Sequence, residues 1–193
     1  LTSMKKLFIP LLVTSTILTG CSQIVSSARE EPIREDLGNR TLGNVIEDEA
    51  IELKVMVNIS KGSAPLAQSH INVDSFNGQV LLTGQVPNEN VRQEAEQIVS
   101  QTREVKRIHN ELEVAGPTST IVRSNDIYLT SRVKLKLLAD KSVEGIRIKV
   151  TTENGVVYLM GLVGQEEADR AIELIREVPG VQRIVKVFEY VPL

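Results

Sequence analysis

Two stretches of the chain decide its fold: Ile71-Asn-Val-Asp-Ser-Phe-Asn-Gly-Gln-Val-Leu-Leu-Thr-Gly-Gln-Val86 and Ile148-Lys-Val-Thr-Thr-Glu-Asn-Gly-Val-Val-Tyr-Leu-Met-Gly-Leu-Val163. They are two copies of one pattern, 77 residues apart at every matched position. Each copy places Asn-Gly between two runs that are rich in apolar residues. Because both turn residues tolerate a positive φ, this arrangement favours a tight β-hairpin. We therefore predict one hairpin in each half of the chain.

An apolar stripe at helical spacing precedes each hairpin. The stripe is Ile51, Val55 and Ile59 in the first copy, and Leu129, Val133 and Leu137 in the second. An aspartate stands just before each stripe, at Asp48 and at Asp126. Aspartate is a favoured helix N-cap, so we expect the two helices to begin there.

A second helical run and a β-type run follow each hairpin. The helical runs are residues 91–99, with Asn88 as the expected cap, and residues 168–178; the β-type runs are 105–108 and 181–184. Each copy therefore reads helix, strand, strand, helix, strand. One helix stripe and one sheet face can bury each other, so we predict an α+β fold of two tandem αββαβ units. In each unit two helices should lie on one face of a three-stranded mixed sheet.

The N-terminus has the layout of an export signal. Lys5 and Lys6 precede an apolar run over residues 7–18, which is too short to span a membrane. The run ends in Leu18-Thr-Gly-Cys21, which resembles the lipobox of bacterial lipoproteins. This resemblance implies a lipoprotein signal peptide over residues 1–20 and acylation of Cys21, the only cysteine. The alternative is an ordinary signal peptide that leaves a spare thiol, a liability in an oxidising compartment.

The following segment has the composition of a tether. It is rich in Ser, Arg, Glu, Gly and Asn and has no apolar period, so it cannot offset its chain entropy by burial. We predict an acylated, flexible tether at 21–46, a first domain at 47–115, a linker at 116–125 and a second domain at 126–193. Ser22, rather than Asp, after the cysteine resembles the outer-membrane class of lipoproteins.

The repeat resembles the BON domain. The Asn-Gly hairpin, the Val-x-Leu-x-Gly that follows it and the terminal Val-x-x-Ile carry the resemblance over both units. A lipobox followed by two such units is similar to dual-BON outer-membrane lipoproteins found at division sites, some of whose relatives are labelled haemolysin. The resemblance implies binding of anionic phospholipid by the second unit and a role in envelope integrity.

The first helices of the two copies differ in their expected surfaces. In copy one the exposed positions include Glu49, Glu52, Lys54 and Asn58. In copy two basic and apolar side chains lie together, a pattern typical of a helix in a lipid interface. The candidate lipid-binding residues are Tyr128, Arg132, Lys134, Leu135, Lys136 and Leu138. The alternative is a solvated basic face whose leucines pack against copy one.

The outer sheet faces differ as well. In copy one we expect a solvated face of Leu81, Thr83, Gln85, His109, Glu111 and Glu113. In copy two the matching face is apolar: Tyr158, Met160, Leu162, Val185 and Val187. So large an apolar set needs a cover, which could be copy one, residues 121–122 or a partner protein. Gly84 and Gly161 mark either a close helix approach or a bulge.

No pattern of catalytic chemistry is present. His70 and His109 are far apart and lack other ligands at metal spacing, so we expect two surface histidines, no metal and no cofactor. The balance of 22 basic and 25 acidic residues argues against nucleic-acid binding.

We therefore expect a non-catalytic, lipid-anchored protein on the periplasmic face of the outer membrane. Its expected partners are anionic phospholipids such as phosphatidylglycerol and cardiolipin. The alternative is a protein-interaction module that docks an outer-membrane assembly complex, with lipid serving only as the anchor.

Overall fold

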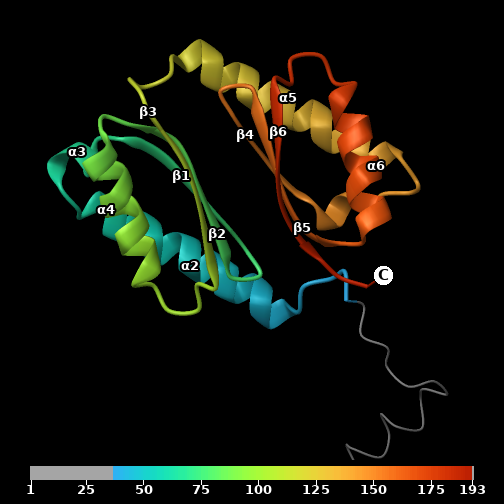
Figure 1. Cartoon of the computed structure of the whole chain (residues 1–193), viewed down its shortest axis with the longest axis horizontal. Helices are drawn as coiled ribbons and strands as arrows, with labels where there is room; N and C mark the ends of the chain where they lie inside the picture. The colour runs from blue at the N-terminus through green and yellow to red at the C-terminus, as the bar shows by residue number, and fades with distance from the viewer. Residues whose placement is uncertain (1–36, 193) are drawn as a thin grey trace, which may run out of the picture. The chain divides into compact units, whose positions relative to one another are not determined.

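The computed structural model describes residues 37–192, in two similar halves (Figure 1). The first half contains α2 (Leu42–Ser60), α3 (Ala64–Ala67), β1 (His70–Phe76), β2 (Gln79–Val86), α4 (Glu89–Ser100) and β3 (Arg107–Val114). The second half contains α5 (Thr120–Ala139), the 3₁₀ turn η1 (Gly145–Arg147), β4 (Lys149–Glu153), β5 (Val156–Val163), α6 (Gln165–Arg176) and β6 (Arg183–Tyr190). The predicted αββαβ order is confirmed in both halves, and only the four-residue helix α3 and the 3₁₀ turn η1 were not expected. Cys21 and the expected signal peptide lie outside the described residues.

Each half forms a three-stranded mixed sheet. In the first sheet β2 pairs antiparallel with β1 and parallel with β3, and β5 does the same with β4 and β6. Both predicted hairpin turns are present. Asn77 and Gly78 have φ of 53° and 77°, and Asn154 and Gly155 have φ of 50° and 74°. Both turn residues therefore have the positive φ that the Asn-Gly sequence favours.

Two helices cover one face of each sheet (Figure 1). The predicted stripes are buried: Ile51, Val55 and Ile59 lie in the first core, and Leu129, Val133 and Leu137 in the second. The neighbouring strand, and not a helix, requires glycine at position 84, because a Cβ there would clash with the carbonyl oxygen of His70 on β1. The φ of +121° at Gly84 adds to the demand for glycine.

The helices α2 and α5 begin earlier than expected. Thr41 caps α2 through Asn44 N–H, and Ser119 caps α5 through Val122 N–H, so the expectation that Asp48 and Asp126 are N-caps was wrong. The last part of the expected tether, residues 42–46, is the start of α2, and much of the expected linker, residues 120–125, is the start of α5. Asn88 does cap α4, as predicted.

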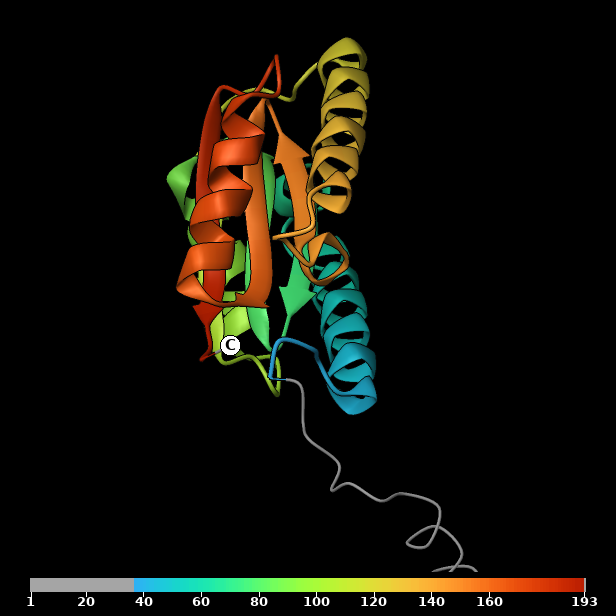
Figure 2. The same ribbon diagram turned by 90° about the vertical axis from the view of Figure 1, so that its right-hand side faces the viewer.

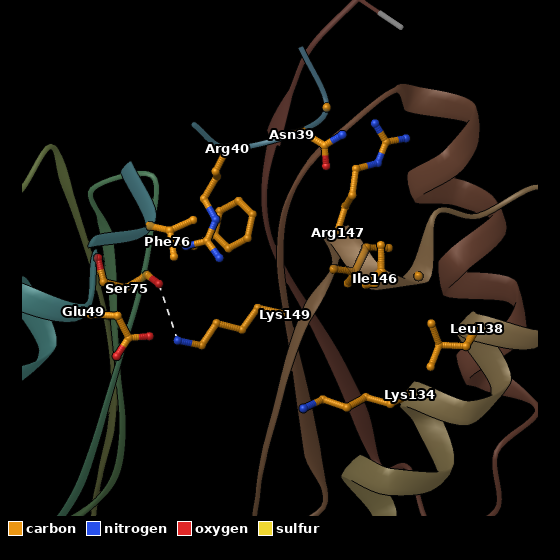
Figure 3. A pocket seen from close by; sticks show the side chains of 14 residues that line it. Asn39, Arg40, Glu49, Ser75, Phe76, Lys134, Leu138, Ile146, Arg147 and Lys149 are labelled. Atoms are coloured by element: carbon orange, nitrogen blue, oxygen red, sulfur yellow. Dashed lines mark hydrogen bonds between the residues drawn. The ribbon is translucent and has the colours of Figure 1, made fainter. Parts of the chain in front are cut away.

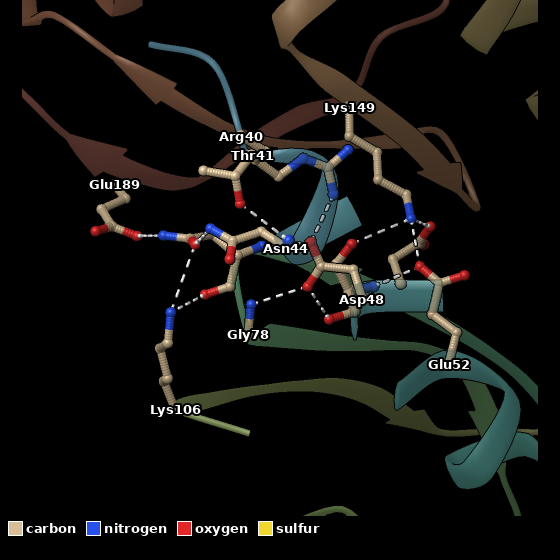
Figure 4. Close-up of polar contacts among 12 residues, drawn as sticks. Arg40, Thr41, Asn44, Asp48, Glu52, Gly78, Lys106, Lys149 and Glu189 are labelled. Carbon is tan, nitrogen blue, oxygen red and sulfur yellow. Dashed lines mark hydrogen bonds and ion pairs between the residues drawn. The ribbon is translucent and has the colours of Figure 1, made fainter. Parts of the chain in front are cut away.

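Instead, each aspartate is buried within its helix and holds the hairpin turn of its own copy. Figure 4 shows the contacts of Asp48 in the first copy. Asp48 accepts hydrogen bonds from the backbone N–H of Asn77 at 2.8 Å and of Gly78 at 2.9 Å. Asp126 accepts the matching pair from Asn154 and Gly155, both at 2.9 Å. The repeated aspartate thus ties the helix to the turn about thirty residues later.

The faces of the two sheets that carry no helices pack against each other. Phe76 and Leu81 of the first sheet form one buried cluster with Val156, Tyr158, Met160, Leu162 and Val187 of the second. Copy one is therefore the cover of the apolar face, whereas Ile121 of the expected linker is exposed. The expected solvated face of copy one was wrong. Its members Leu81, Thr83 and Gln85 are buried, and His109, Glu111 and Glu113 are partly buried, because the second sheet excludes water from them.

Polar contacts at the edges of this interface hold the halves together (Figure 4). The ammonium group of Lys149 on β4 lies 2.6 Å from Glu52 and 3.0 Å from Asp74 of the first half. Burial alone would lower the pKa of Lys149, but the two carboxylates reverse this effect and raise it. At the buried edge, Glu153 accepts a hydrogen bond from Gln85 at 2.7 Å. These polar contacts stabilise the packing of one half on the other.

Candidate functional site

Helix α5 carries the candidate side chains on the surface that its buried stripe leaves free. Tyr128 is 59% exposed, Leu135 68% and Leu138 58%. These side chains add little to the core, and apolar side chains that are exposed together on one helix are typical of an interaction surface. The alternative that the extra leucines of α5 pack against copy one does not hold.

The three basic candidates on α5 have different surroundings. Arg132 is half-buried, with its guanidinium 5.8 Å from the ring centre of Tyr128. Lys136 is half-buried and lies 2.6 Å from Glu177, and this hydrogen bond lowers the pKa of the Glu177 carboxyl. Lys134 is exposed, and no ion pair among the described residues includes it. Among these three cations, Lys134 is therefore the most available to an external anion.

The six candidates do not form a single patch. Lys134 and Leu138 line a groove of about 610 Å³ between the halves, together with residues that include Arg40, Phe76, Ile146 and Lys149 (Figure 3). Tyr128, Arg132 and Leu135 do not line it. The helix thus presents one set of candidates to the groove and another to the outer surface.

Ile146 was not among the sequence candidates. It lies on η1, lines the same groove as Leu138 and is 83% exposed. Its sequence signal is an apolar side chain directly after Gly145 in a polar loop. The exposed apolar surface near the end of α5 therefore includes Ile146 of η1 as well as Leu138 of the helix.

The described residues offer little for catalysis. Within residues 37–192 no group of three or more His, Cys, Asp or Glu side chains could hold a metal ion. His70 begins β1, as expected, but both His70 and His109 are partly buried, so the expectation of two surface histidines was wrong. Burial, with help from Arg107, lowers the pKa of His109. In the same part of the chain, no helix has the length and hydropathy needed to cross a membrane.

The described residues form two tandem αββαβ units, and comparison with known proteins identifies the family to which they belong. The BON domain model matches residues 47–116 and 125–192, so the chain belongs to the BON domain family. It is 36% identical to the "Outer membrane lipoprotein DolP" of Haemophilus influenzae over 98% of both chains. It is also 36% identical to the "21 kDa hemolysin" of Actinobacillus pleuropneumoniae over 79% of this chain and 78% of the other.

Among solved structures, the C-terminal domain of CdsD, a structural protein of the type III secretion system of Chlamydia trachomatis, aligns with 75% of this chain and 67% of its own. The TM-score is 0.30 and the identity 15%.

Proposed function

We propose that this protein is a non-catalytic lipoprotein of the outer membrane that faces the periplasm and binds anionic phospholipid through α5. The observation that carries the proposal is the exposure of Tyr128, Leu135 and Leu138 on the helix that also presents Lys134. Apolar and basic side chains on one helix suit the boundary between acyl chains and headgroups. Similarity to an outer-membrane lipoprotein over nearly the whole chain supports the location.

The expected affinity is modest. Each basic residue near an anionic membrane contributes about 1 kcal/mol, and Lys136 is already paired with Glu177. The chain also has no Trp to anchor the interface, so Tyr128 must serve at headgroup depth. Acylation at Cys21 would keep the local lipid concentration high, so that weak contacts of α5 suffice. The expected lipids are phosphatidylglycerol and cardiolipin, in support of envelope integrity.

Titration with phosphatidylglycerol or cardiolipin micelles, followed by NMR, tests the proposal. We expect shifts centred on Tyr128 and the rest of residues 126–138, and their loss on combined charge reversal of Arg132, Lys134 and Lys136. Phosphatidylcholine micelles are the control. An absence of shifts with the anionic lipids would leave the other candidate, a module that docks an outer-membrane assembly complex.

A further inference from the structure

A groove of about 300 Å³ between the end of α6 and the start of β6 is lined by three cations and by no carboxylate. The cations are Arg176, Arg183 and Lys186, and all three side chains are exposed. Within residues 37–192 none of them takes part in a side-chain hydrogen bond or an ion pair. Figure 2 shows α6 and β6 on the left, whereas α2 and α5 lie on the right. The groove is therefore a positively charged surface separate from the lipid-binding candidates of α5.

Strand β6 offers an open edge beside these cations. The order β4-β5-β6 leaves one side of β6 without a neighbouring strand. Just after β6, the N–H of Val191 donates to the carbonyl of Val163 on β5 at 3.0 Å. The backbone groups of successive strand residues point in opposite directions, so those of Lys186 and Phe188 point away from β5. They are placed to pair with a further strand.

The matching edge of the first half, on β3, is closed by side chains of its own copy. Arg92 of α4 donates to the backbone carbonyl of Asn110 at 3.0 Å. The side chain of Asn110 accepts from the N–H of Leu112 at 3.3 Å and donates to Glu96 of α4 at 2.8 Å. Such contacts occupy the edge groups that another strand would need.

The second half has lost this closure. Helices α4 and α6 have 12 residues each, and strands β3 and β6 have eight each, so their positions match one to one. At the positions of Arg92, Glu96 and Asn110, the second half has Ala168, Ile172 and Lys186. Alanine and isoleucine cannot make the polar contacts of α4, and a lysine ammonium group donates but does not accept. The same replacements open the edge and add a cation to it.

We propose that β6 and this groove bind an extended acidic segment of a partner protein, which adds a fourth strand to the second sheet. Its backbone pairs with the open edge at Lys186 and Phe188. Acidic side chains at alternate positions of the segment then meet Lys186 and Arg176, on the side of the sheet that α6 covers. The inference does not rest on lipid binding by α5.

Charge and burial select this occupant over two others. A second copy of the chain, paired through the same edge, would bring two sets of like charges together. A bilayer would find nothing to insert, because the apolar lining residues Ile172, Val181 and Ile184 are buried or half-buried. An acidic strand satisfies both the cations and the open backbone groups.

The test uses the full chain and a fluorescent peptide of four Glu-Val repeats, which matches the eight residues of β6 in length. A peptide of four Lys-Val repeats is the control. We expect only the Glu-Val peptide to bind, and we expect it to slow hydrogen exchange, measured by NMR, at the N–H groups of Lys186 and Phe188. The double variant Arg176→Glu/Lys186→Glu should weaken binding about tenfold. The matched control Arg103→Glu/Arg107→Glu makes the same change in net charge at exposed positions of the first half and should leave binding nearly unchanged.

Four other results would overturn the inference. The first is a failure of the Glu-Val peptide to bind, and the second is an equal loss of binding in the two double variants, which would indicate general attraction between charges. The third is binding without slower exchange at Lys186 and Phe188, which would mean that the cations hold an anion but that no strand is added. The fourth is slower exchange at these residues that appears without peptide as protein concentration rises, which would assign the edge to a second copy of the chain.

Discussion

The carboxylate of Asp48, in the middle of α2, lies 2.9 Å from the backbone nitrogen of Gly78 in the first hairpin turn. Asp126 and Gly155 repeat this relationship at the same distance in the second half. A turn with positive φ at both central residues leaves backbone N–H groups that no strand partner satisfies. The helix that covers the sheet supplies the acceptor, so turn and helix stabilise each other.

Asp126→Ala should therefore destabilise the protein. The N–H groups of Asn154 and Gly155 would lose their acceptor in a buried place, which costs about 2 kcal/mol. Urea unfolding followed by circular dichroism measures the change. Asp169→Ala, at an exposed site on α6, is the control and should leave the midpoint unchanged. Equal midpoints for the two variants would contradict the structural role of Asp126.

Asp48 should make stability depend on pH in the acid range. Burial alone would raise the pKa of its carboxyl, but hydrogen bonds from Gly78, Ser75, Arg40 and Asn77 outweigh burial and lower it. A lowered pKa in the folded state contributes stability that is present above the unfolded-state pKa of about 3.9 and is lost as pH falls through the folded value.

The comparison with Asp48→Asn isolates this contribution. The variant lacks the titrating group, so the difference in free energy of unfolding between wild type and variant should be largest above pH 5. It should shrink as pH falls below about 4. Urea unfolding at a series of pH values measures it. A difference that stays constant with pH would show that Asp48 does not titrate as its contacts indicate.

The aspartates also show which features could be predicted from sequence. Both hairpins were predicted because an Asn-Gly turn is specified by the residues within it. The role of Asp48 was not, because its partners lie about thirty residues away, and the N-cap rule offered a local explanation for the same residue. The true caps, Thr41 and Ser119, precede the apolar stripes by more than a turn, so the stripes gave no indication of them.

Surfaces were harder to predict than elements. Thr83 and Gln85 alternate with apolar residues, which predicts a solvated face, yet the second sheet buries them. The sequence predicts that Tyr158 and its neighbours need a cover. It does not show that the face of copy one that covers them is buried in turn. Expecting α2 to begin at Asp48 also left Leu42 and Ile46, two exposed apolar residues, out of the helix.

Lys149→Met should weaken the contact between the two halves. Glu52 and Asp74, both largely buried, would lose the ammonium group between them and repel each other. We expect a loss of about 2 kcal/mol in the free energy of unfolding. Lys54→Met, which removes an exposed lysine of α2, is the control and should have little effect. If the two variants unfolded at the same urea concentration, the Lys149 contacts would not stabilise the interface.

Tyr158 should report on the interface at high pH. Burial between the sheets, followed by the nearby Glu111 carboxylate, raises its pKa to about 12. A raised pKa in the folded state gives stability that is present below the unfolded value of about 10 and is lost as pH rises toward 12. Ultraviolet titration should show one phenol that ionises late, and Tyr158→Phe should remove that phase. If the wild-type titration had no late phase, the Tyr158 phenol would be in contact with water and not buried between the sheets.

Among the three basic candidates of α5, charge reversal at Lys134 should impair lipid binding most. Lys136 is paired with Glu177 and Arg132 lies beside the ring of Tyr128, whereas Lys134 is exposed at the groove. Lys134→Glu replaces an attraction to an anionic surface by a repulsion, a change of about 2 kcal/mol. Sedimentation with vesicles that contain phosphatidylglycerol measures the loss, and phosphatidylcholine vesicles are the control. Added salt should shrink the difference between wild type and variant, because it screens both the attraction and the repulsion. An equal or larger loss of vesicle binding for Lys136→Glu would contradict the prediction. It would mean that the ion pair of Lys136 with Glu177 opens at the membrane, so that exposure in the free protein does not predict which cation contributes most.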